Sequence, residues 1–329
     1  MTLPRIVLLT TGGTIAGASD AASGPDEYTA GAIAGEALLA SVPGLRERAD
    51  ILVEPCLALD SRDMGPEDWL TVARAARELI AREDVTGVVV THGTDTLEET
   101  ALALELLLPA AKPVVITGAM RPADAVSSDG PANLLDAVRV AIDPAARGRG
   151  ALVVFAEQVL PARGVRKAHS ARLDAFTAAD GAVGATRPEV RFFRPPAPRP
   201  EALPWPDARL PRVEVVFVAA GTSPQWLEAA CDMGARGIVL ALTGNGSVPD
   251  AWREAIRRVT LAGVPVVRAS RCGAGFVGHR RVDVELGTVA AGRLSPAQAR
   301  VALSLAIAGA DASAFAPIAL TDGRPHQSS

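Results

Sequence analysis

Apolar, β-branched segments alternate with amphipathic segments along the whole chain. In the first half, the apolar runs that predict strands are residues 5–10, 51–57, 87–91, 113–117 and 151–156. Between them, apolar residues recur with helical spacing in DWLTVARAARELIARED, LEETALALELLL and NLLDAVRVAI. Strands that are apolar on both faces and separated by helices are typical of a parallel sheet with helices on each side.

The same alternation resumes after a proline-rich segment. Residues 188–211 read PEVRFFRPPAPRPEALPWPDARLP, and so much proline removes backbone donors and excludes a helix. Beyond it, strands are predicted at VEVVFVAAG, GIVLALTG and VPVVRAS, and helices at PQWLEAACDMG, PDAWREAIRRVTLAG and SPAQARVALSLAIAG. We therefore predict two α/β domains with mainly parallel sheets: a larger catalytic domain over 1–190, a linker over 191–211, and a smaller domain over 212–329.

Composition supports a globular protein and argues against two classes of partner. Of the 329 residues, 49% are hydrophobic and 21% are charged, which permits a sizeable core. The net charge is −4 and the charges are mixed, which argues against nucleic acid or an anionic membrane surface as a partner. Apolar runs such as ALALELLLPAA are shorter than the roughly 20 residues that span a bilayer.

The cysteines and the amino terminus bear on location. Cys56, Cys231 and Cys272 show no C-x-x-C spacing, which favours free thiols in a reducing cytoplasm over zinc or disulfides. The apolar run in MTLPRIVLL is too short for a secretory signal. We expect a cytoplasmic protein without metal or cofactor; the alternative is a secreted or periplasmic form whose leader has been removed.

In open parallel sheets, ligands bind beyond the carboxyl ends of the strands, so the residues that follow the strands are candidates. The segment TTGGTIAG, residues 10–17, has neither the dinucleotide-binding spacing nor the phosphate-binding P-loop pattern. It is either a tight strand-to-helix turn or a turn whose glycines bring the backbone close to a ligand and present the Thr14 hydroxyl. The loop that follows ends on Tyr28, the single tyrosine of the chain.

The segment VVVTHGTDTLEET, residues 88–100, places Thr94 and Asp95 where a helix begins. Amide groups and the helix dipole favour developing negative charge there. Thr96 and Glu99 are spaced as a capping box. His92 is expected to hold a backbone carbonyl and to have no catalytic role.

Other strand ends carry weaker signals. In LDSRDM, Ser61 and Asp63 are candidates to cap the helix that begins near Pro66. In RGVRKAHSARLDAF, Lys167 reads in isolation as part of a solvated basic loop, and TGNGS and AAGTS read as glycine-rich turns. No G-x-S-x-G or H-E-x-x-H pattern occurs in the chain. Hydrolysis would therefore use threonines, activated by a neighbouring base, a phenolate or a lysine amine.

Two of these segments, LLTTGGTIAG and VVVTHGTDTL, resemble the signature stretches of the bacterial-type L-asparaginase and glutaminase–asparaginase family. DSRDM, KPVVITGAMRP, DGPANLLDAV, RKAHSARLDAF and GNGS are also similar, so the resemblance covers essentially the whole chain and its two-domain division. It implies an amidohydrolase that converts L-asparagine to L-aspartate and ammonia through a threonine acyl-enzyme, with weaker glutamine hydrolysis.

The resemblance also implies roles for individual residues. Thr14 is similar to the primary nucleophile, and Tyr28 to the tyrosine that contacts it from a loop closing over the substrate. Thr94, Asp95 and Lys167 resemble a second cluster that activates water.

Substrate contacts are implied in the same way. Ser61 and Asp95 resemble the residues that hold the α-carboxylate and α-amino groups, and the carbonyl of Ala119 resembles a contact to the departing nitrogen. Gly13 and Gly93 supply backbone beside the two threonines, where N–H groups can stabilise an oxyanion.

In two places the chain departs from the family pattern. Arg62 stands where many relatives have glutamine; its long side chain either strengthens carboxylate binding or, as we expect, points outward. The family completes its site with an acid and an asparagine from the neighbouring subunit. Asp283 and Glu285 are the candidate acids, and Ser247 stands at the asparagine position, with Asn245 two residues earlier.

The resemblance further implies a homotetramer built from two intimate dimers, with sites between subunits. Two other functions are open. One is the glutaminase-like subunit of a tRNA-dependent amidotransferase, against which the absence of a basic surface argues. The other is a non-catalytic amino-acid-binding protein, which would need no activated hydroxyls.

Overall fold

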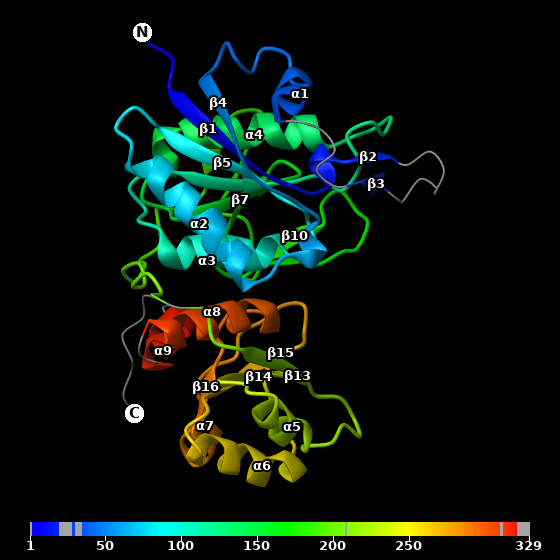
Figure 1. Cartoon of the computed structure of the whole chain (residues 1–329), viewed down its shortest axis with the longest axis vertical. Coiled ribbons are helices and arrows are strands. Elements are labelled where there is room, and N and C mark those ends of the chain that lie inside the picture. The colour runs from blue at the N-terminus through cyan, green and yellow to red at the C-terminus, as the bar shows by residue number, and fades with distance from the viewer. Residues whose placement is uncertain (1, 20–27, 30–34, 208, 310–311, 321–329) are drawn as a thin grey trace. The chain divides into compact units, whose positions relative to one another are not determined.

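The protein has a two-domain α/β fold with mainly parallel sheets, as predicted (Figure 1). The structure, a computed structural model, describes residues 2–19, 28–29, 35–207, 209–309 and 312–320. The chain divides into two units, Met1–Pro196 and Ala197–Ser329. The division falls within the proline-rich segment; the domain limits at 190 and 212 stay predictions.

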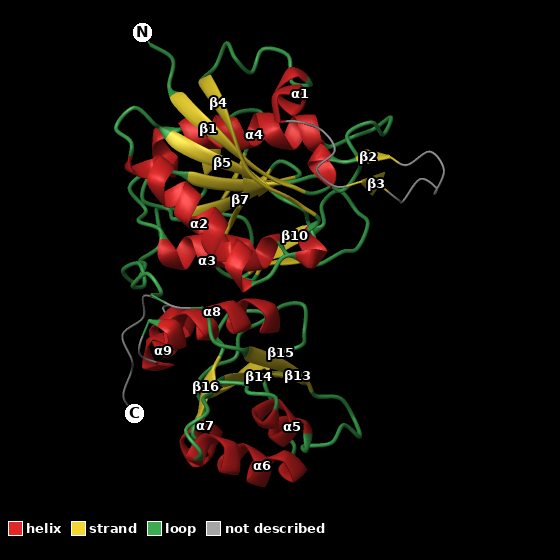
Figure 2. Cartoon of the chain, in the orientation of Figure 1, coloured by secondary structure: helices red, strands yellow, loops and turns green. Residues whose placement is uncertain are grey.

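The described residues of the first unit form an eight-stranded sheet (Figure 2). Its parallel part runs, in spatial order, through β4 (Asp50–Leu59), β1 (Arg5–Gly12), β5 (Gly87–Thr91), β6 (Val114–Thr117) and β7 (Ala151–Phe155). Antiparallel strands then extend it: β8 (Gln158–Pro161), β11 (Gly184–Ala185) and β12 (Arg191–Phe192). The hydrophobic pattern predicted the parallel strands and missed the short antiparallel ones.

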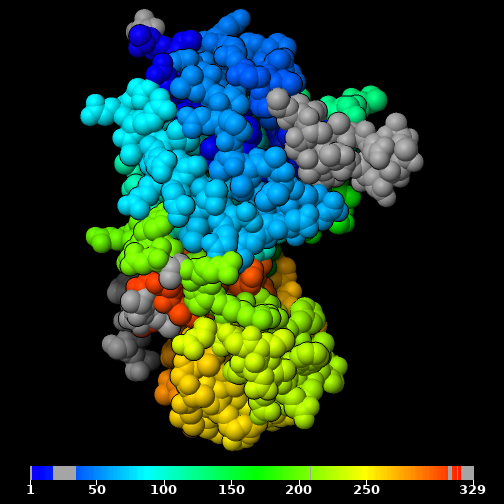
Figure 3. Space-filling view, viewed as in Figure 1, coloured from blue at the N-terminus to red at the C-terminus, as the bar shows by residue number. Residues whose placement is uncertain are grey.

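Helices cover both faces of this sheet, because consecutive residues of its central strands are apolar and buried. Ile6, Leu8 and Val89 pack in one core cluster with residues of α1 (Gly35–Ala40) and α4 (Gly130–Ile142). The other face is covered by α2 (Pro66–Ala81) and α3 (Leu97–Leu107). In the space-filling view, atoms of α2 form much of this side of the unit (Figure 3).

Short elements follow several strands of the first unit. The 3-10 turns are η1 (Thr14–Ala16), η2 (Ser61–Asp63) and η3 (Pro144–Ala146). Two hairpins lie outside the main sheet, one formed by β2 (Ala18–Ser19) and β3 (Tyr28–Thr29), the other by β9 (Val165–Lys167) and β10 (Phe176–Ala178).

The sheet reverses its strand order between β1 and β5. The chain leaves β1 toward β4 on one side, whereas it leaves β5 through α3 toward β6 on the other. Adjacent strands whose connections depart in opposite directions open a crevice at their carboxyl ends, where open α/β sheets bind ligands. The turns TTGGT and THGTD therefore flank the position at which the fold itself predicts a site.

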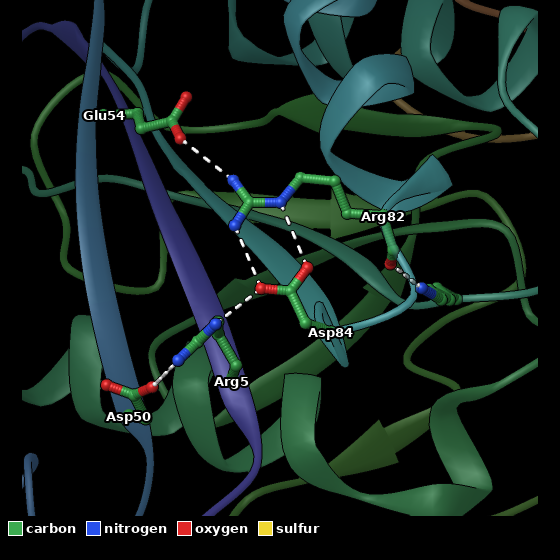
Figure 4. A network of polar contacts seen from close by, with 6 residues as sticks. Arg5, Asp50, Glu54, Arg82 and Asp84 are labelled. Carbon is green, nitrogen blue, oxygen red and sulfur yellow. Dashed lines mark hydrogen bonds and ion pairs between the residues drawn. The ribbon is translucent and has the colours of Figure 1, made fainter.

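At the amino ends of the strands, ion pairs link β1 and β4 to the end of α2 (Figure 4). Arg5 lies 2.8 Å from Asp50 and 2.5 Å from Asp84, and Arg82 lies 3.0 Å from Asp84 and 3.5 Å from Glu54. Hydrogen bonds from Arg82 and Arg5 hold the pKa of Asp84 well below its usual value. This network therefore lies at the opposite ends of the strands from the crevice.

The described residues of the second unit form a four-stranded parallel sheet. Its strands are β13 (Val213–Phe217), β14 (Gly237–Leu242), β15 (Val266–Ser270) and β16 (Thr288–Ala290). Its helices are α5 (Trp226–Asp232), α6 (Asp250–Leu261), α7 (Arg281–Leu286), α8 (Pro296–Ala308) and α9 (Phe315–Leu320), and η4 (Ala312–Ala314) is a 3-10 turn. No helix within the described ranges of the chain is long and apolar enough to cross a membrane.

A fully buried ion pair organises the loops of the second unit. The Arg268 guanidinium, on β15, bonds both carboxylate oxygens of Asp283 at 2.6 Å, and it also donates to the carbonyls of Gly246 and Gly278. Burial raises the pKa of Asp283, but hydrogen bonds from Arg268, the Thr288 hydroxyl and a backbone amide outweigh burial and hold it below its usual value. The pair thus ties two strand-end loops to one buried cation.

Replacing Asp283 with Asn should destabilise the protein by about 3–5 kcal/mol, because it leaves the Arg268 charge buried without its counter-charge. The double variant Arg268→Met with Asp283→Leu should lose less, since no buried charge remains. Urea denaturation checks both. As a control, Glu228→Gln removes an exposed partner of Arg258 and should change the free energy of unfolding by less than about 1 kcal/mol. Equal losses in all three variants would contradict this account.

Candidate active site

Three strand-end turns of the first unit pack closely against one another. A Cβ atom added to Gly13, whose φ is +78°, would lie 2.3 Å from the amide nitrogen of Gly93. One added to Gly93 would lie 2.5 Å from the hydroxyl oxygen of Ser61. Only glycine permits such approaches. Thr14 and Thr94 follow these two glycines in the chain, and both are buried.

Ser61 links the turn after β4 to the start of α3. Its hydroxyl accepts a hydrogen bond from the amide of Asp95 at 3.2 Å, and its carbonyl accepts one from the Thr96 hydroxyl at 2.7 Å. Ser61 is almost fully buried. The contacts fix Ser61 against the residues that precede α3.

Both capping predictions for these segments are wrong. The N-cap of α2 is Gly65, whose amide donates to the Asp68 carboxylate at 2.8 Å, so neither Ser61 nor Asp63 caps that helix. Thr96 is the N-cap of α3 but makes no capping hydrogen bond with its side chain, because its hydroxyl is engaged with the Ser61 carbonyl. Ser61 and Thr96 instead make the hydrogen bonds that join the two turns.

Lys167 reaches the same turn from β9. Its ammonium donates to the Thr94 hydroxyl oxygen at 2.8 Å and to the Asp95 carboxylate at 2.6 Å. The Lys167 side chain is 18% exposed, whereas that of Asp95 is 52% exposed. The interpretation of Lys167 as part of a solvated loop is therefore wrong. An amine at this distance can, in its neutral form, take the proton of the threonine hydroxyl.

His92 has the structural role predicted for it. Its Nδ1 lies 2.7 Å from the Gly93 carbonyl and its Nε2 lies 2.8 Å from the Thr100 hydroxyl. Burial lowers the pKa of His92 to about 4, although the hydrogen bond to Gly93 opposes this. The imidazole is neutral at physiological pH and both ring nitrogens have partners.

The turn after β6, which carries Ala119, is held by two side chains of the DGPAN segment. The Asp129 carboxylate accepts from the amides of Met120 and Arg121, both at 3.0 Å. Asn133 donates to the Gly118 carbonyl at 3.0 Å and accepts from a backbone amide after β7. Sequence reasoning missed both residues. The available signal was an Asp and an Asn four residues apart at a helix start directly after a strand-end turn.

The remaining candidates of the first unit lie as follows. Tyr28 is in β3, where its backbone pairs with Ser19 of β2, and its side chain lies outside the described residues. Arg62 points outward as expected: its side chain is 69% exposed and lies 2.9 Å from the Asp60 carboxylate.

The candidates of the second unit contact other residues of that unit. Asn245 and Ser247 are exposed on the turn after β14, and the Asn245 amide fits between the Phe276 carbonyl and the Arg280 guanidinium, both at 2.8 Å. Asp283 is enclosed by the Arg268 pair described above. Glu285 lies 2.5 Å from Arg253 and 2.8 Å from Arg281. Among the described residues, no group of three or more His, Cys, Asp or Glu is placed to hold a metal ion.

Comparison with known proteins matches both units. Residues 5–198 match the family described as "Asparaginase, N-terminal", and residues 212–314 match "Glutaminase/Asparaginase C-terminal domain". The chain is 38% identical to "L-asparaginase 2" of Bacillus subtilis, over 93% of this chain and 83% of the relative. It is 38% identical to "Probable L-asparaginase periplasmic" of Haemophilus influenzae, over 93% and 89%.

A solved structure extends this likeness to the fold. The crystal structure of a "Probable Cytoplasmic L-asparaginase" from Campylobacter jejuni matches with a TM-score of 0.89 and 37% sequence identity, over 97% of this chain and 99% of that one. The matched share of each chain includes both units.

Replacing Gly93 with Ala should lower the free energy of unfolding by about 1–3 kcal/mol, because the added methyl overlaps buried Ser61. Gly65→Ala is the matched control, since no atom lies within 4 Å of the added Cβ. Thermal unfolding of the two variants measures the difference. A Gly93→Ala protein as stable as Gly65→Ala would show that the turns are not packed in this way.

Because the folded protein keeps His92 neutral down to about pH 4, while an unfolded histidine takes up a proton near pH 6.5, its contribution to stability is complete above pH 6.5. It is lost as pH falls from 6.5 toward 4, by about 3 kcal/mol. Urea denaturation between pH 7 and pH 4 should show this loss of unfolding free energy for the native chain and not for His92→Gln. If the free energy of unfolding changed equally with pH in the two proteins, the assignment would be contradicted.

Proposed function

The chain belongs to the asparaginase family, and we propose that it hydrolyses the side-chain amide of L-asparagine through an acyl-enzyme on Thr14. It is an amidohydrolase whose relatives are named L-asparaginases and glutaminase-asparaginases. The observation that carries the mechanism is the contact of Lys167 with Thr94 and Asp95, next to the backbone contact between Gly13 and Gly93.

In the first step, the Thr14 oxygen attacks the carboxamide carbon of the substrate. The C–N bond breaks, the departing nitrogen takes up a proton and leaves as ammonia, and an ester to Thr14 forms. The Ala119 carbonyl, on the turn held by Asp129 and Asn133, is proposed to accept from the amide nitrogen. Backbone amides beside Thr14 and Thr94 are the candidate oxyanion donors; one such donor lowers a barrier by typically about 3 kcal/mol.

In the second step, water attacks the ester. Thr94 is proposed to take the water proton while its own hydroxyl proton passes to Lys167 in its neutral amine form. That proton then returns to the Thr14 oxygen as the ester bond breaks. Ser61 and Asp95 are proposed to bind the α-carboxylate and α-amino groups of the substrate. The Ser61 hydroxyl accepts a hydrogen bond from the Asp95 amide, which keeps the two residues adjacent. One methylene changes binding by only about 1–3 kcal/mol, so slower glutamine hydrolysis is expected.

Three further parts of the proposal rest on the family resemblance. Tyr28 is expected to contact Thr14 when the loop that carries it covers the substrate. Asn245 and Ser247 are expected to complete the site of a neighbouring subunit in a homotetramer. We expect a cytoplasmic location, in keeping with the Campylobacter jejuni protein, which is named cytoplasmic, although the Haemophilus influenzae relative is named periplasmic.

Thr14→Ala and Thr94→Val should each lower kcat for L-asparagine by about 1,000-fold or more, because each removes a group that takes part in the reaction. The check is coupled ammonia detection with L-asparagine, L-glutamine and D-asparagine side by side. Thr71→Val, on the exposed face of α2, is the matched control and should keep native turnover. Near-native turnover in both site variants would refute the mechanism. Calorimetric binding of asparagine by the native chain without ammonia release would favour a binding protein.

A further inference from the structure

Lys167 is a proposed site residue that lies outside the main sheet. It ends β9, which pairs only with β10 among the described strands, whereas Thr94 and Asp95 lie between β5 and α3. The hydrogen bonds from Lys167 to these two residues therefore depend on how the β9–β10 hairpin is attached to the start of α3.

Glu98 makes that attachment. Its carboxylate oxygen Oε2 accepts a hydrogen bond from the backbone amide of Lys167 at 2.8 Å. Glu98 is half-buried in the first turn of α3, three residues after Asp95. Lys167 lies opposite Phe176 of β10, yet its amide donates to Glu98, so the contact joins the outer edge of β9 to the helix.

We propose that Glu98 is a positioning residue for the hydrolysis of the acyl-enzyme: it holds the main chain of Lys167 so that the ammonium reaches Thr94 and Asp95. This inference rests on the proposed function. A carboxylate suits the task because it makes a charge-assisted hydrogen bond to an amide and is favoured at a helix N-terminus.

A second contact restrains the hairpin without replacing the first. The rings of Phe176, on β10, and Phe155, at the end of β7, lie with centroids 4.9 Å apart. This packing keeps the hairpin near the sheet, but two packed rings can shift slightly against each other without losing contact. The hydrogen bond to Glu98 restricts distance and angle more closely, and it acts on Lys167 itself. A misplacement of about 1 Å at a reacting group can cost 100-fold in rate.

Three variants separate this role from charge and from folding. Glu98→Ala removes the acceptor, and Glu98→Asp keeps the charge but is too short to reach the amide. Glu98→Gln keeps an oxygen in place. We expect kcat for L-asparagine to fall about 10- to 100-fold in the first two, with KM not raised, and to stay within about 3-fold of native in the third. Glu78→Ala, an exposed position of α2, is the control for removing a helical carboxylate.

Hydroxylamine then identifies the step that is slowed. Its nitrogen attacks the ester carbon of the acyl-enzyme, the bond to the Thr14 oxygen breaks, and a hydroxamate leaves while Thr14 regains its proton. If Lys167 is misplaced, water attack is limiting, and hydroxylamine should raise ammonia release by Glu98→Ala more than by the native enzyme.

The outcomes are distinct. Native kcat in both Glu98→Ala and Glu98→Asp overturns the positioning role. A loss of kcat that Glu98→Gln shares also overturns it. The same holds if hydroxylamine does not relieve the loss of kcat and the variant has a lowered melting temperature. A native chain that releases no ammonia from asparagine refutes the proposed function instead. If Glu98→Ala does not fold, Glu98→Asp provides the same comparison.

Discussion

The contact between the backbones of Gly13 and Gly93 is the constraint on which the proposed site depends. β1 and β5 are adjacent parallel strands, so their turns would lie side by side in any case. A Cβ atom at Gly13 would overlap the backbone of Gly93 and push the two turns apart, and a Cβ atom at Gly93 would overlap Ser61. The same close packing continues from Gly93 to Ser61, so it sets the positions of both the proposed nucleophile turn and the proposed substrate-binding turn.

Given this packing, the chemistry cannot use the histidine that lies within it. His92 is fully buried, its burial lowers the pKa to about 4, and both ring nitrogens have partners. It therefore supports the Gly93 turn, and in the proposed mechanism the base comes from another element. Lys167 supplies an amine at hydrogen-bond distance from Thr94, and its position depends on contacts made outside the main sheet.

Much of the fold could be predicted from the sequence because buried parallel strands are apolar on both faces. The run at 87–91 coincides with β5, and Lys167, Thr94 and Asp95 were named together through the family resemblance. The two-residue strands β11 and β12 could not be predicted, since two residues show no periodicity. The partners of Ser61 could not either, because its hydrogen bonds reach residues 34 and 35 positions away, whereas capping rules consider only near neighbours.

Three side chains that hold the proposed site share one property: they bond to main-chain atoms. Ser61 holds the amide of Asp95, Asp129 holds the amide of Met120, and Glu98 holds that of Lys167. A residue fixed through its backbone keeps its own side chain available for chemistry, because the bond that positions it does not involve its hydroxyl, carboxylate or amine. A site whose reaction uses threonine hydroxyls, which are weak nucleophiles until a base is aligned with them, gains most from this arrangement.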